Sequence, residues 1–217
     1  MDLNYFLELA INGALAGLMY SLVAMGIVLI YKSSSVPNLA QGALVMLGAY
    51  VVLAFSNGIG MSMWLAIPLA MLTMGAVGMG VERFALRRLA GRPIVMILMM
   101  TLGLEIFLSA IAMTVWGGTA RPLRLGISDD PLFVGPLLLN RTYVIGAVVA
   151  LVLFGVFVAF FRSRSGVVLR AIADDYTASW SVGISVERGV ALSWAMASMV
   201  ATIAGILWGS IQGEDQS

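Results

Sequence analysis

The stretch SSSVPNLAQGALVMLGAYVVLAFSNGIGMSMWLAIPLAMLTMGAVGMGV, residues 33–81, is a run of 49 residues without a charged side chain. The hydrocarbon core of a bilayer is about 30 Å thick and is crossed by about 20 apolar residues of helix. The run is therefore too long for one span, and Asn57-Gly58-Ile59-Gly60 near its middle is typical of a turn. It predicts two membrane spans, roughly 39–55 and 61–81.

Apolar stretches elsewhere in the chain predict four more spans. They cover 9–31, 94–116, 142–161 and 189–213, and only Glu105 interrupts them with a charge inside the bilayer. Hydrophobic residues make up 61% of the chain, charged residues 11%, and the mean hydropathy is +1.01, whereas about a quarter of the residues of soluble domains are charged. We therefore expect an all-α, polytopic bundle of about six transmembrane helices, a single domain over residues 1–217.

The basic residues fall unevenly on the two sides of such a bundle. One set of alternating connections holds nine of them and the other set holds three, and cytoplasmic loops are the ones that carry an excess of Lys and Arg. We expect the first set in the cytoplasm, and the N-terminus outside together with 117–141, an irregular, solvated connection. The first set is Lys32, Arg83, Arg87, Arg88, Arg92, Arg162, Arg164, Arg170 and Arg188; the second is Arg121, Arg124 and Arg141.

Several kinds of chemistry are disfavoured by what the chain lacks. It has no cysteine and no histidine, which removes disulfides, thiolate nucleophiles, imidazole bases and the commonest metal ligands. A formal net charge of +1 gives no basic stripe for nucleic acid. We expect a protein that is not an enzyme, with no catalytic, metal or cofactor site and no nucleic-acid partner.

Small residues recur at four-residue spacing in two of the predicted spans. The stripes are Gly13, Gly17 and Ser21 in the first span, and Ser193, Ala197, Ala201, Gly205 and Gly209 in the last. Such stripes let helix backbones approach closely, so we expect both to pack inside the bundle. A helix that lines a path for a small solute would show the same pattern, and the sequence does not separate the two interpretations.

Glu105 lies near the middle of the fourth span, where an ionised side chain is costly unless it faces protein or water. Thr101 and Ser109 lie one turn away on either side, so hydroxyl groups are expected to satisfy it. Two interpretations stay open for Glu105: a structural, hydrogen-bonded glutamate, or a group in a translocation path.

The inner connection 162–188 is the longest of the connections placed in the cytoplasm. Within it, Val168, Ile172, Tyr176 and Trp180 repeat every four residues, which predicts one amphipathic helix over 168–182 that ends near Gly183. Helices that lie on lipid usually carry Lys or Arg along the polar face, whereas this one carries Asp174 and Asp175 beside Arg170. We therefore expect the helix to dock in a groove on a cytoplasmic protein.

Three motifs give the chain a resemblance to a known family. They are Asn12-Gly13 through Tyr20-Ser21-Leu22-Val23-Ala24-Met25-Gly26, then Pro37-Asn38-Leu39-Ala40-Gln41-Gly42-Ala43-Leu44-Val45-Met46-Leu47-Gly48-Ala49-Tyr50, then Gly166, Leu169-Arg170-Ala171, Ala173-Asp174, Ala178 and Gly183-Ile184. In this order they resemble the permease subunits of branched-chain amino acid ABC importers, of the LivH type, over essentially the whole chain. That family normally continues with a glycine-rich segment and about two more helices, so the resemblance implies a C-terminally truncated member.

The resemblance implies a function and a set of partners. A permease of this kind forms half of a translocation pathway in the bacterial inner membrane, with a second related permease, two cytoplasmic ATPases that bind the ATP, and an external solute-binding protein. The solute would be a branched-chain amino acid, or urea, an amide or another small polar solute. The residues expected to couple to the ATPases are Arg170, Ala171, Asp174, Ala178, Gly183 and Ile184, and those expected to line the path are Asn38, Gln41 and Glu105.

A transporter from another class is the alternative. In a proton-coupled secondary transporter, Glu105 would carry the proton, and uptake would collapse with an uncoupler and ignore cytoplasmic ATPases. Dependence on ATP therefore separates the two hypotheses.

Overall fold

The computed structural model describes residues 3–89, 92–117, 132–134 and 137–214. Six of its helical stretches are long and apolar enough to cross a membrane, so the predicted all-α, multi-pass bundle is confirmed. In chain order, the elements are α1 (Leu3–Ser34), α2 (Gln41–Leu53), η1 (Ala54–Gly58), α3 (Met63–Val81), η2 (Glu82–Leu86), η3 (Arg87–Leu89), α4 (Ile94–Trp116), β1 (Leu132–Val134), β2 (Leu137–Leu139), α5 (Arg141–Arg162), α6 (Arg164–Asp174), α7 (Tyr176–Ser181) and α8 (Val186–Glu214).

The ends of the helices follow from local chemistry. Asn140 caps α5, because its Oδ1 accepts hydrogen bonds from the backbone N–H groups of Thr142 and Tyr143. Gly117, with φ +84°, follows the end of α4, and its N–H donates to the carbonyl of Met113. The turn predicted between the second and third spans is present, as η1 and a bend that includes Gly60 at φ +72°.

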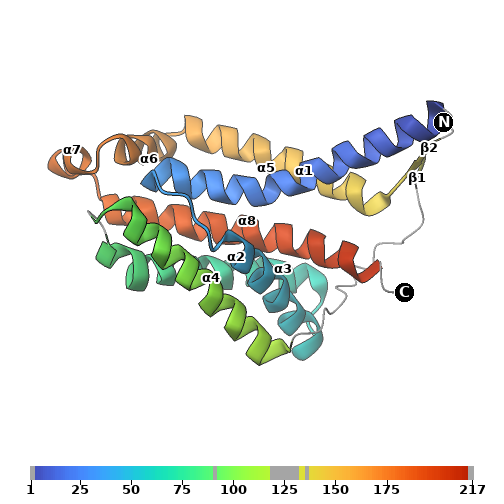
Figure 1. Cartoon of the computed structure of the whole chain (residues 1–217), viewed down its shortest axis with the longest axis horizontal. Coiled ribbons are helices and arrows are strands. Elements are labelled where there is room, and N and C mark those ends of the chain that lie inside the picture. The colour runs from blue at the N-terminus through green and yellow to red at the C-terminus, as the bar shows by residue number, and fades with distance from the viewer. Residues whose placement is uncertain (1–2, 90–91, 118–131, 135–136, 215–217) are drawn as a thin grey trace.

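Helix α8 runs through the centre of the bundle (Figure 1). It packs against α1 on one side and against α2 and α3 on the other, while α5 packs on α1 and α4 packs on α2. In its membrane-crossing part, 61% of the residues are buried inside the protein, against 17% for α4. The two helices therefore have different neighbours: α8 is surrounded by protein, whereas most of α4 is left to lipid or to a partner.

Small side chains let α8 pack closely against its neighbours. Ser193, Ala197 and Ala201 are fully buried, as the stripe in the last span predicted. A side chain added at Gly205 would overlap the carbonyl of Val45 in α2. Close approach of two backbones is what small residues permit in membrane helices, and it stands in place of a hydrophobic driving force.

The matching stripe in α1 behaves differently. Gly13 and Gly17 are exposed, and no atom would lie within 4 Å of a Cβ added at either position. The expectation that this stripe packs inside the bundle is therefore wrong at Gly13 and Gly17 for the chain by itself, while Ser21 is half-buried.

A short hairpin precedes α5, where the sequence predicted only an irregular connection. Strands β1 and β2 pair antiparallel, with Leu132 opposite Leu139. The side chain of Asn12 ties the hairpin to α1: its Nδ2 donates to the carbonyl of Leu138, and its Oδ1 accepts from the N–H of Asn140. Residues 118–131 of the predicted outer connection lie outside the described residues.

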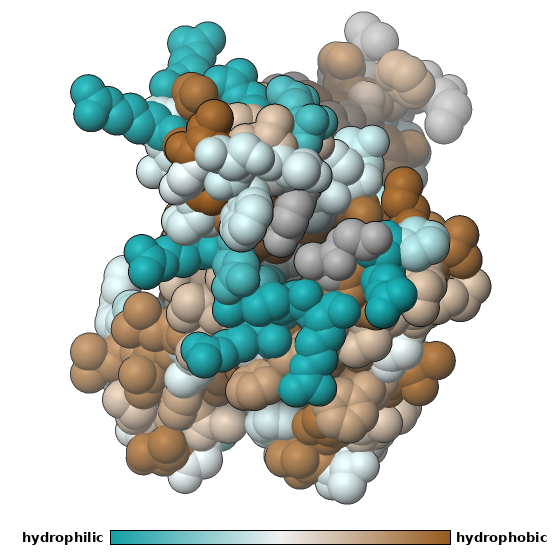
Figure 2. Space-filling model, turned by 90° about the vertical axis from the view of Figure 1, so that its left-hand side faces the viewer, coloured by the Kyte–Doolittle hydropathy of each residue, from teal (hydrophilic) through white to brown (hydrophobic). Residues whose placement is uncertain are grey.

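The end of the bundle at which α1 ends and α8 begins is called the basic end here. The elements that carry the larger set of Lys and Arg, namely the end of α1, η2, η3, the start of α4, and the α5 to α8 connection, all meet there (Figure 1). Hydrophilic residues gather across this end in Figure 2. Lys32 lies over the ring of Phe161, with its Nζ 4.9 Å from the ring centre, and so joins α1 to α5.

Candidate functional site

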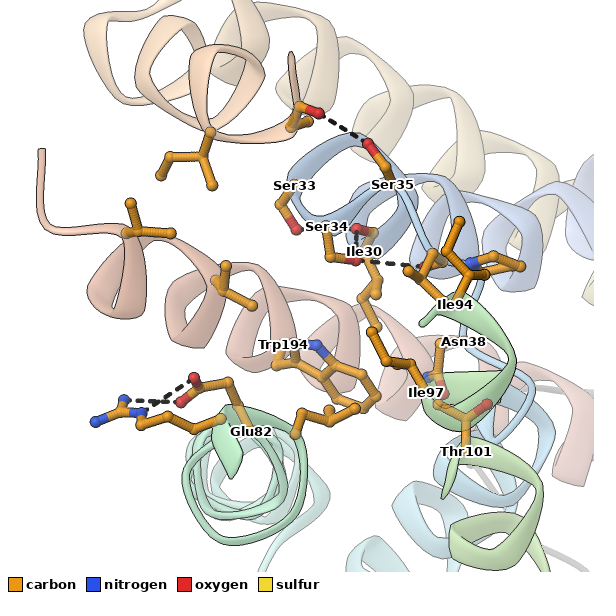
Figure 3. Close-up of a pocket in the computed structure, with 18 of the residues that line it drawn as sticks. Ile30, Ser33, Ser34, Ser35, Asn38, Glu82, Ile94, Ile97, Thr101 and Trp194 are labelled. Carbon is orange, nitrogen blue, oxygen red and sulfur yellow. Dashed lines mark hydrogen bonds and ion pairs between the residues drawn. The ribbon is translucent and has the colours of Figure 1, made fainter. Parts of the chain in front are cut away.

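A cavity of about 340 Å³ lies at the basic end, among α1, η2, α4, α6, α7 and α8 (Figure 3). Its volume falls in the range of pockets that hold small ligands. Its wall includes the apolar side chains of Ile30, Ile97 and Trp194. The buried polar side chains of Asn38 and Thr101 contribute to the same wall. The cavity therefore offers both apolar surface and hydrogen-bonding groups to whatever enters it.

The segment between α1 and α2 brings Asn38 into the cavity. After Ser34 the chain turns back along the bundle, and α2 starts inside it, away from the end at which α8 begins (Figure 1). Asn38 is 2% exposed and Ala40 is fully buried. Non-helical backbone at this depth is tolerated in membrane proteins only inside protein or beside a water-filled cavity. We call residues 35–40 the re-entrant segment.

Asn38 is held in place by two hydrogen bonds. Its Oδ1 accepts from the backbone N–H of Ala40 at 3.0 Å, and its Nδ2 donates to Oε1 of Gln41 at 3.3 Å. The predicted path residues thus separate into two roles: Asn38 lines the cavity, whereas the side chain of Gln41 lies outside the lining and orients Asn38.

Gln41 and Gly26 bring the first two sequence motifs together. The Gln41 amide fills the space where a side chain at Gly26 would lie, two turns before the end of α1. Nε2 of Gln41 is buried and has no hydrogen-bond partner among the described residues. A buried N–H donor without a partner is costly, so within the described part of the chain the amide of Gln41 is satisfied only at its oxygen, by Asn38.

An ion-pair chain borders the cavity. Arg87 contacts the buried carboxylate of Glu82 at 2.9 Å and the carboxylate of Glu187, at the start of α8, at 2.8 Å. Glu82 and Arg87 are five residues apart, a spacing that would separate them on an α-helix. The π-helical turn η2 brings them to one side and permits a bidentate pair. The connection between α3 and α4 is thereby fastened to α8.

The predicted helix over 168–182 is two helices, and the prediction of a single one is wrong. The break is at Asp175, with φ −150° and ψ 106°, whose Oδ1 accepts from the N–H of Ala178 and so caps α7. The predicted stripe is divided accordingly: Ile172 is buried, whereas Trp180 is 69% exposed. Helix α6 buries Gly166, Leu169 and Ile172 instead.

The six predicted coupling residues lie along α6, α7 and the turn after them. Arg170, Asp174 and Ala178 are exposed, and Ala171 is half-buried. Gly183 is exposed at φ +83°, as expected of the residue that ends the helical segment, and Ile184 packs with the buried residues of α6. Their coupling role stays a prediction.

Glu105 lies away from the cavity lining. It is half-buried on α4, and the hydroxyl of Ser109 donates to its Oε1 at 3.4 Å. The hydroxyl of Thr101 donates instead to the carbonyl of Leu98. Of the two hydroxyl groups expected to satisfy Glu105, only Ser109 does so in this arrangement.

Comparison with known proteins agrees with the resemblance in the three motifs. Residues 9–217 match the family model described as "Branched-chain amino acid transport system / permease component". The chain belongs to this family. This permease also has curated relatives. It is 26% identical to the "High-affinity branched-chain amino acid transport system permease protein BraD" of Pseudomonas aeruginosa, over 98% of this chain and 73% of the relative.

Two further relatives carry similar names. This permease is 29% identical to the "High-affinity branched-chain amino acid transport system permease protein LivH" of Escherichia coli, over 96% of this chain and 72% of the relative. It is 28% identical to the "Probable branched-chain amino acid transport permease protein LivH" of Methanocaldococcus jannaschii, over 85% of this chain and 60% of the relative. The chain thus spans about three fifths to three quarters of the length of these relatives. No solved structure matches it significantly.

Sequence reasoning missed several groups at this permease's cavity. Arg87 was counted only among the basic residues of an inner connection and Glu82 was not singled out, because five-residue spacing is no signal on an α-helix. Ser33 and Ser35 line the cavity, and the signal available for them was three consecutive serines, separated from Pro37 by one residue.

Proposed function

We propose that this chain is one of the two permease subunits of an ABC importer and forms half of the membrane pathway for branched-chain amino acids or a related small polar solute. Family membership supports the kind of system, and the names of the relatives support the solute class. The partners would be a second related permease, two cytoplasmic ATPases and an external solute-binding protein. ATP would be bound by the ATPases, and this chain would hold no cofactor.

The observation that carries the proposal is that α6 and α7 form part of the cavity wall. Ile172 and Ala173 of α6 and Thr177 of α7 line the cavity, while Trp180 of α7 is 69% exposed and Val182, directly after α7, is 74% exposed. A partner that binds the exposed side of α6 and α7 can therefore move a wall of the cavity. This is the arrangement that a transporter driven by an external ATPase requires.

The orientation follows from the distribution of charge. The basic end would face the cytoplasm of a bacterial inner membrane, with the N-terminus outside, because the excess of Lys and Arg lies at this end. The cavity is then the inner mouth of the pathway. Anionic headgroups and cytoplasmic subunits would meet the same basic surface.

Transport would proceed by alternating access. ATP binding closes the two ATPases, α6 and α7 move with them, and the helices around the cavity repack. Ile30, Ile97 and Trp194 present the apolar surface that a branched side chain needs, and Asn38 presents a polar group. No residue of this chain performs catalysis in this scheme.

The first test is the energy source. The complete importer is reconstituted in proteoliposomes with the external binding protein and radiolabelled leucine, with ATP enclosed or absent. We expect accumulation only with ATP, unchanged by an uncoupler, and retained in the variant Glu105→Gln. Accumulation without ATP that an uncoupler and Glu105→Gln both abolish would refute the proposal and support the proton-coupled alternative.

The second test is the docking surface. The chain has no native cysteine, so Trp180→Cys carries a single thiol at the tip of α7 for a photoactivated crosslinker. We expect it to capture the tagged ATPase of the importer in intact membranes. Trp64→Cys is the matched control, because Trp64 is 89% exposed near the start of α3, at the opposite end. Equal capture from both positions, or from neither, contradicts the docking surface.

A further inference from the structure

Ser35 has a backbone conformation that favours glycine. Its φ is +55°, and it is the one non-glycine residue with positive φ in the described part of the chain. It directly follows the last residue of α1, and its N–H donates to the carbonyl of Tyr31 at 2.8 Å. Helices commonly end on a left-handed residue of this kind, usually a glycine. This conformation is sterically unfavourable for a serine, so it persists only where contacts with neighbouring groups stabilise it.

The side chain of Ser35 makes one such stabilising contact. Its hydroxyl donates to the carbonyl of Ala173 in α6 at 2.9 Å, between residues 138 positions apart in the chain (Figure 3). Ala173 lies in the last turn of α6, where backbone carbonyls lack partners within the helix. The bond therefore links the end of α1 to the end of α6, two helices that also pack against each other.

Ser35 is also where the re-entrant segment leaves α1. Beyond it, Val36 is 5% exposed and Asn38 is 2% exposed, and Ser35 to Asn38 all line the cavity. The direction in which this segment enters the bundle is set by the backbone angles at Ser35. A change of φ there would move Asn38, which is buried too tightly to move by side-chain rotation alone.

We propose that Ser35 is a positioning residue that transmits the movement of α6 to the re-entrant segment, and so couples the ATPase-driven element to the polar wall of the cavity. The inference rests on the proposed function. When α6 moves away, Ser35 loses the bond to Ala173 that holds its left-handed conformation. The backbone then relaxes to negative φ, and the re-entrant segment carries Asn38 to a second position.

The experiment compares three variants in the reconstituted importer and measures ATP hydrolysed per leucine transported. Ser35→Ala keeps the steric penalty and loses the bond, and Ser35→Gly loses both. Ser35→Asn adopts positive φ readily and has an amide that can donate to Ala173. Loss of one hydrogen bond predicts a ratio about two- to tenfold higher in Ser35→Ala and Ser35→Gly. Ser35→Asn should restore the ratio towards wild type.

Ser56→Ala is the matched control, because the Ser56 hydroxyl donates to its neighbour Asn57 in η1, between α2 and α3, and lies outside α6 and α7. It should leave the ratio unchanged. The proposal is overturned if Ser35→Ala and Ser35→Gly keep the wild-type ratio, or if hydrolysis and transport fall in parallel. Failure of the proposed function is a separate result, since the wild-type importer would then show no ATP-driven uptake at all.

Discussion

Helices α8 and α1 carry similar stripes of small residues and use them in opposite ways. In α8, Ala197 and Ala201 are fully buried, and Gly205 lies against the backbone of α2. In α1, Gly13 and Gly17 have open space where a side chain would lie. A stripe therefore indicates that a close neighbour can be accommodated, whereas the neighbour itself is decided by the other helices of the bundle.

The difference has a physical cause. A membrane helix gains little from burying apolar surface, because lipid is as apolar as the side chains. Close packing thus depends on a second helix whose backbone fits the groove. Helices α2 and α3 supply one for α8, while among the described residues no neighbouring atom lies within 4 Å of a Cβ added at Gly13 or Gly17 of α1. Three substitutions test whether this contrast holds.

The largest effect is expected from Gly205→Val. The new side chain would overlap the carbonyl of Val45. The backbones of α2 and α8 cannot shift to relieve this overlap as easily as a flexible side chain could. Overpacking of this kind costs about 1–3 kcal/mol or more. We expect a lower midpoint of thermal unfolding in detergent and less protein in the membrane. A midpoint equal to wild type would mean that α2 and α8 are not in close contact.

A smaller effect is expected from Gly26→Ala. The added methyl group overlaps the amide of Gln41, which can shift because it is the end of a flexible side chain. We expect destabilisation of about 1 kcal/mol, together with weaker leucine transport, because Gln41 orients Asn38.

The double variant Gly26→Ala with Gln41→Ala is the control for that contact. Removing the Gln41 amide removes the overlap, so the double variant should unfold at a higher temperature than the sum of the two single changes predicts. Strictly additive effects would show that the two residues do not touch.

The smallest effect is expected from Gly17→Val, which is the counterpart of Gly205→Val. Open space at Gly17 accepts the side chain, so the free energy of unfolding of the isolated chain should stay within about 0.5 kcal/mol of wild type. A loss as large as that of Gly205→Val would remove the contrast between the two helices. A loss seen only in the assembled importer would instead locate a partner on this face of α1.

The sequence was sufficient for the number and approximate limits of the spans. Charge-free stretches mark membrane helices because no other open structure satisfies its backbone in lipid. The lengths of charge-free stretches could not place the re-entrant segment. Hydropathy does not distinguish a loop at the surface from one that returns into the bundle beside its own helix. Ser33 to Asn38 therefore looked like an ordinary inner connection, although they line the cavity.

Periodicity was a weaker guide at the basic end. The four-residue repeat from Val168 to Trp180 predicted one helix, because it took no account of Asp175 as a cap. Glu105 drew attention as a lone charge within a span, yet it lies away from the cavity, whereas Glu82 at a span boundary borders it. Which charged group faces a cavity depends on helix rotation and on π-helical turns, and neither can be read from composition.

Deleting one residue from Glu82–Leu86 would return η2 to ordinary α-helical geometry. The arginine would then stand four residues after Glu82, about 40° from it around an α-helix, so the pair that the π-helical turn now permits at five-residue spacing would be kept. The π-helical turn η2 thus acts as a one-residue insertion in an α-helix. It sets the rotation of the α3 to α4 connection about the helix axis. In a relative that lacks this residue, an arginine four positions after the buried glutamate would be the counterpart of Arg87.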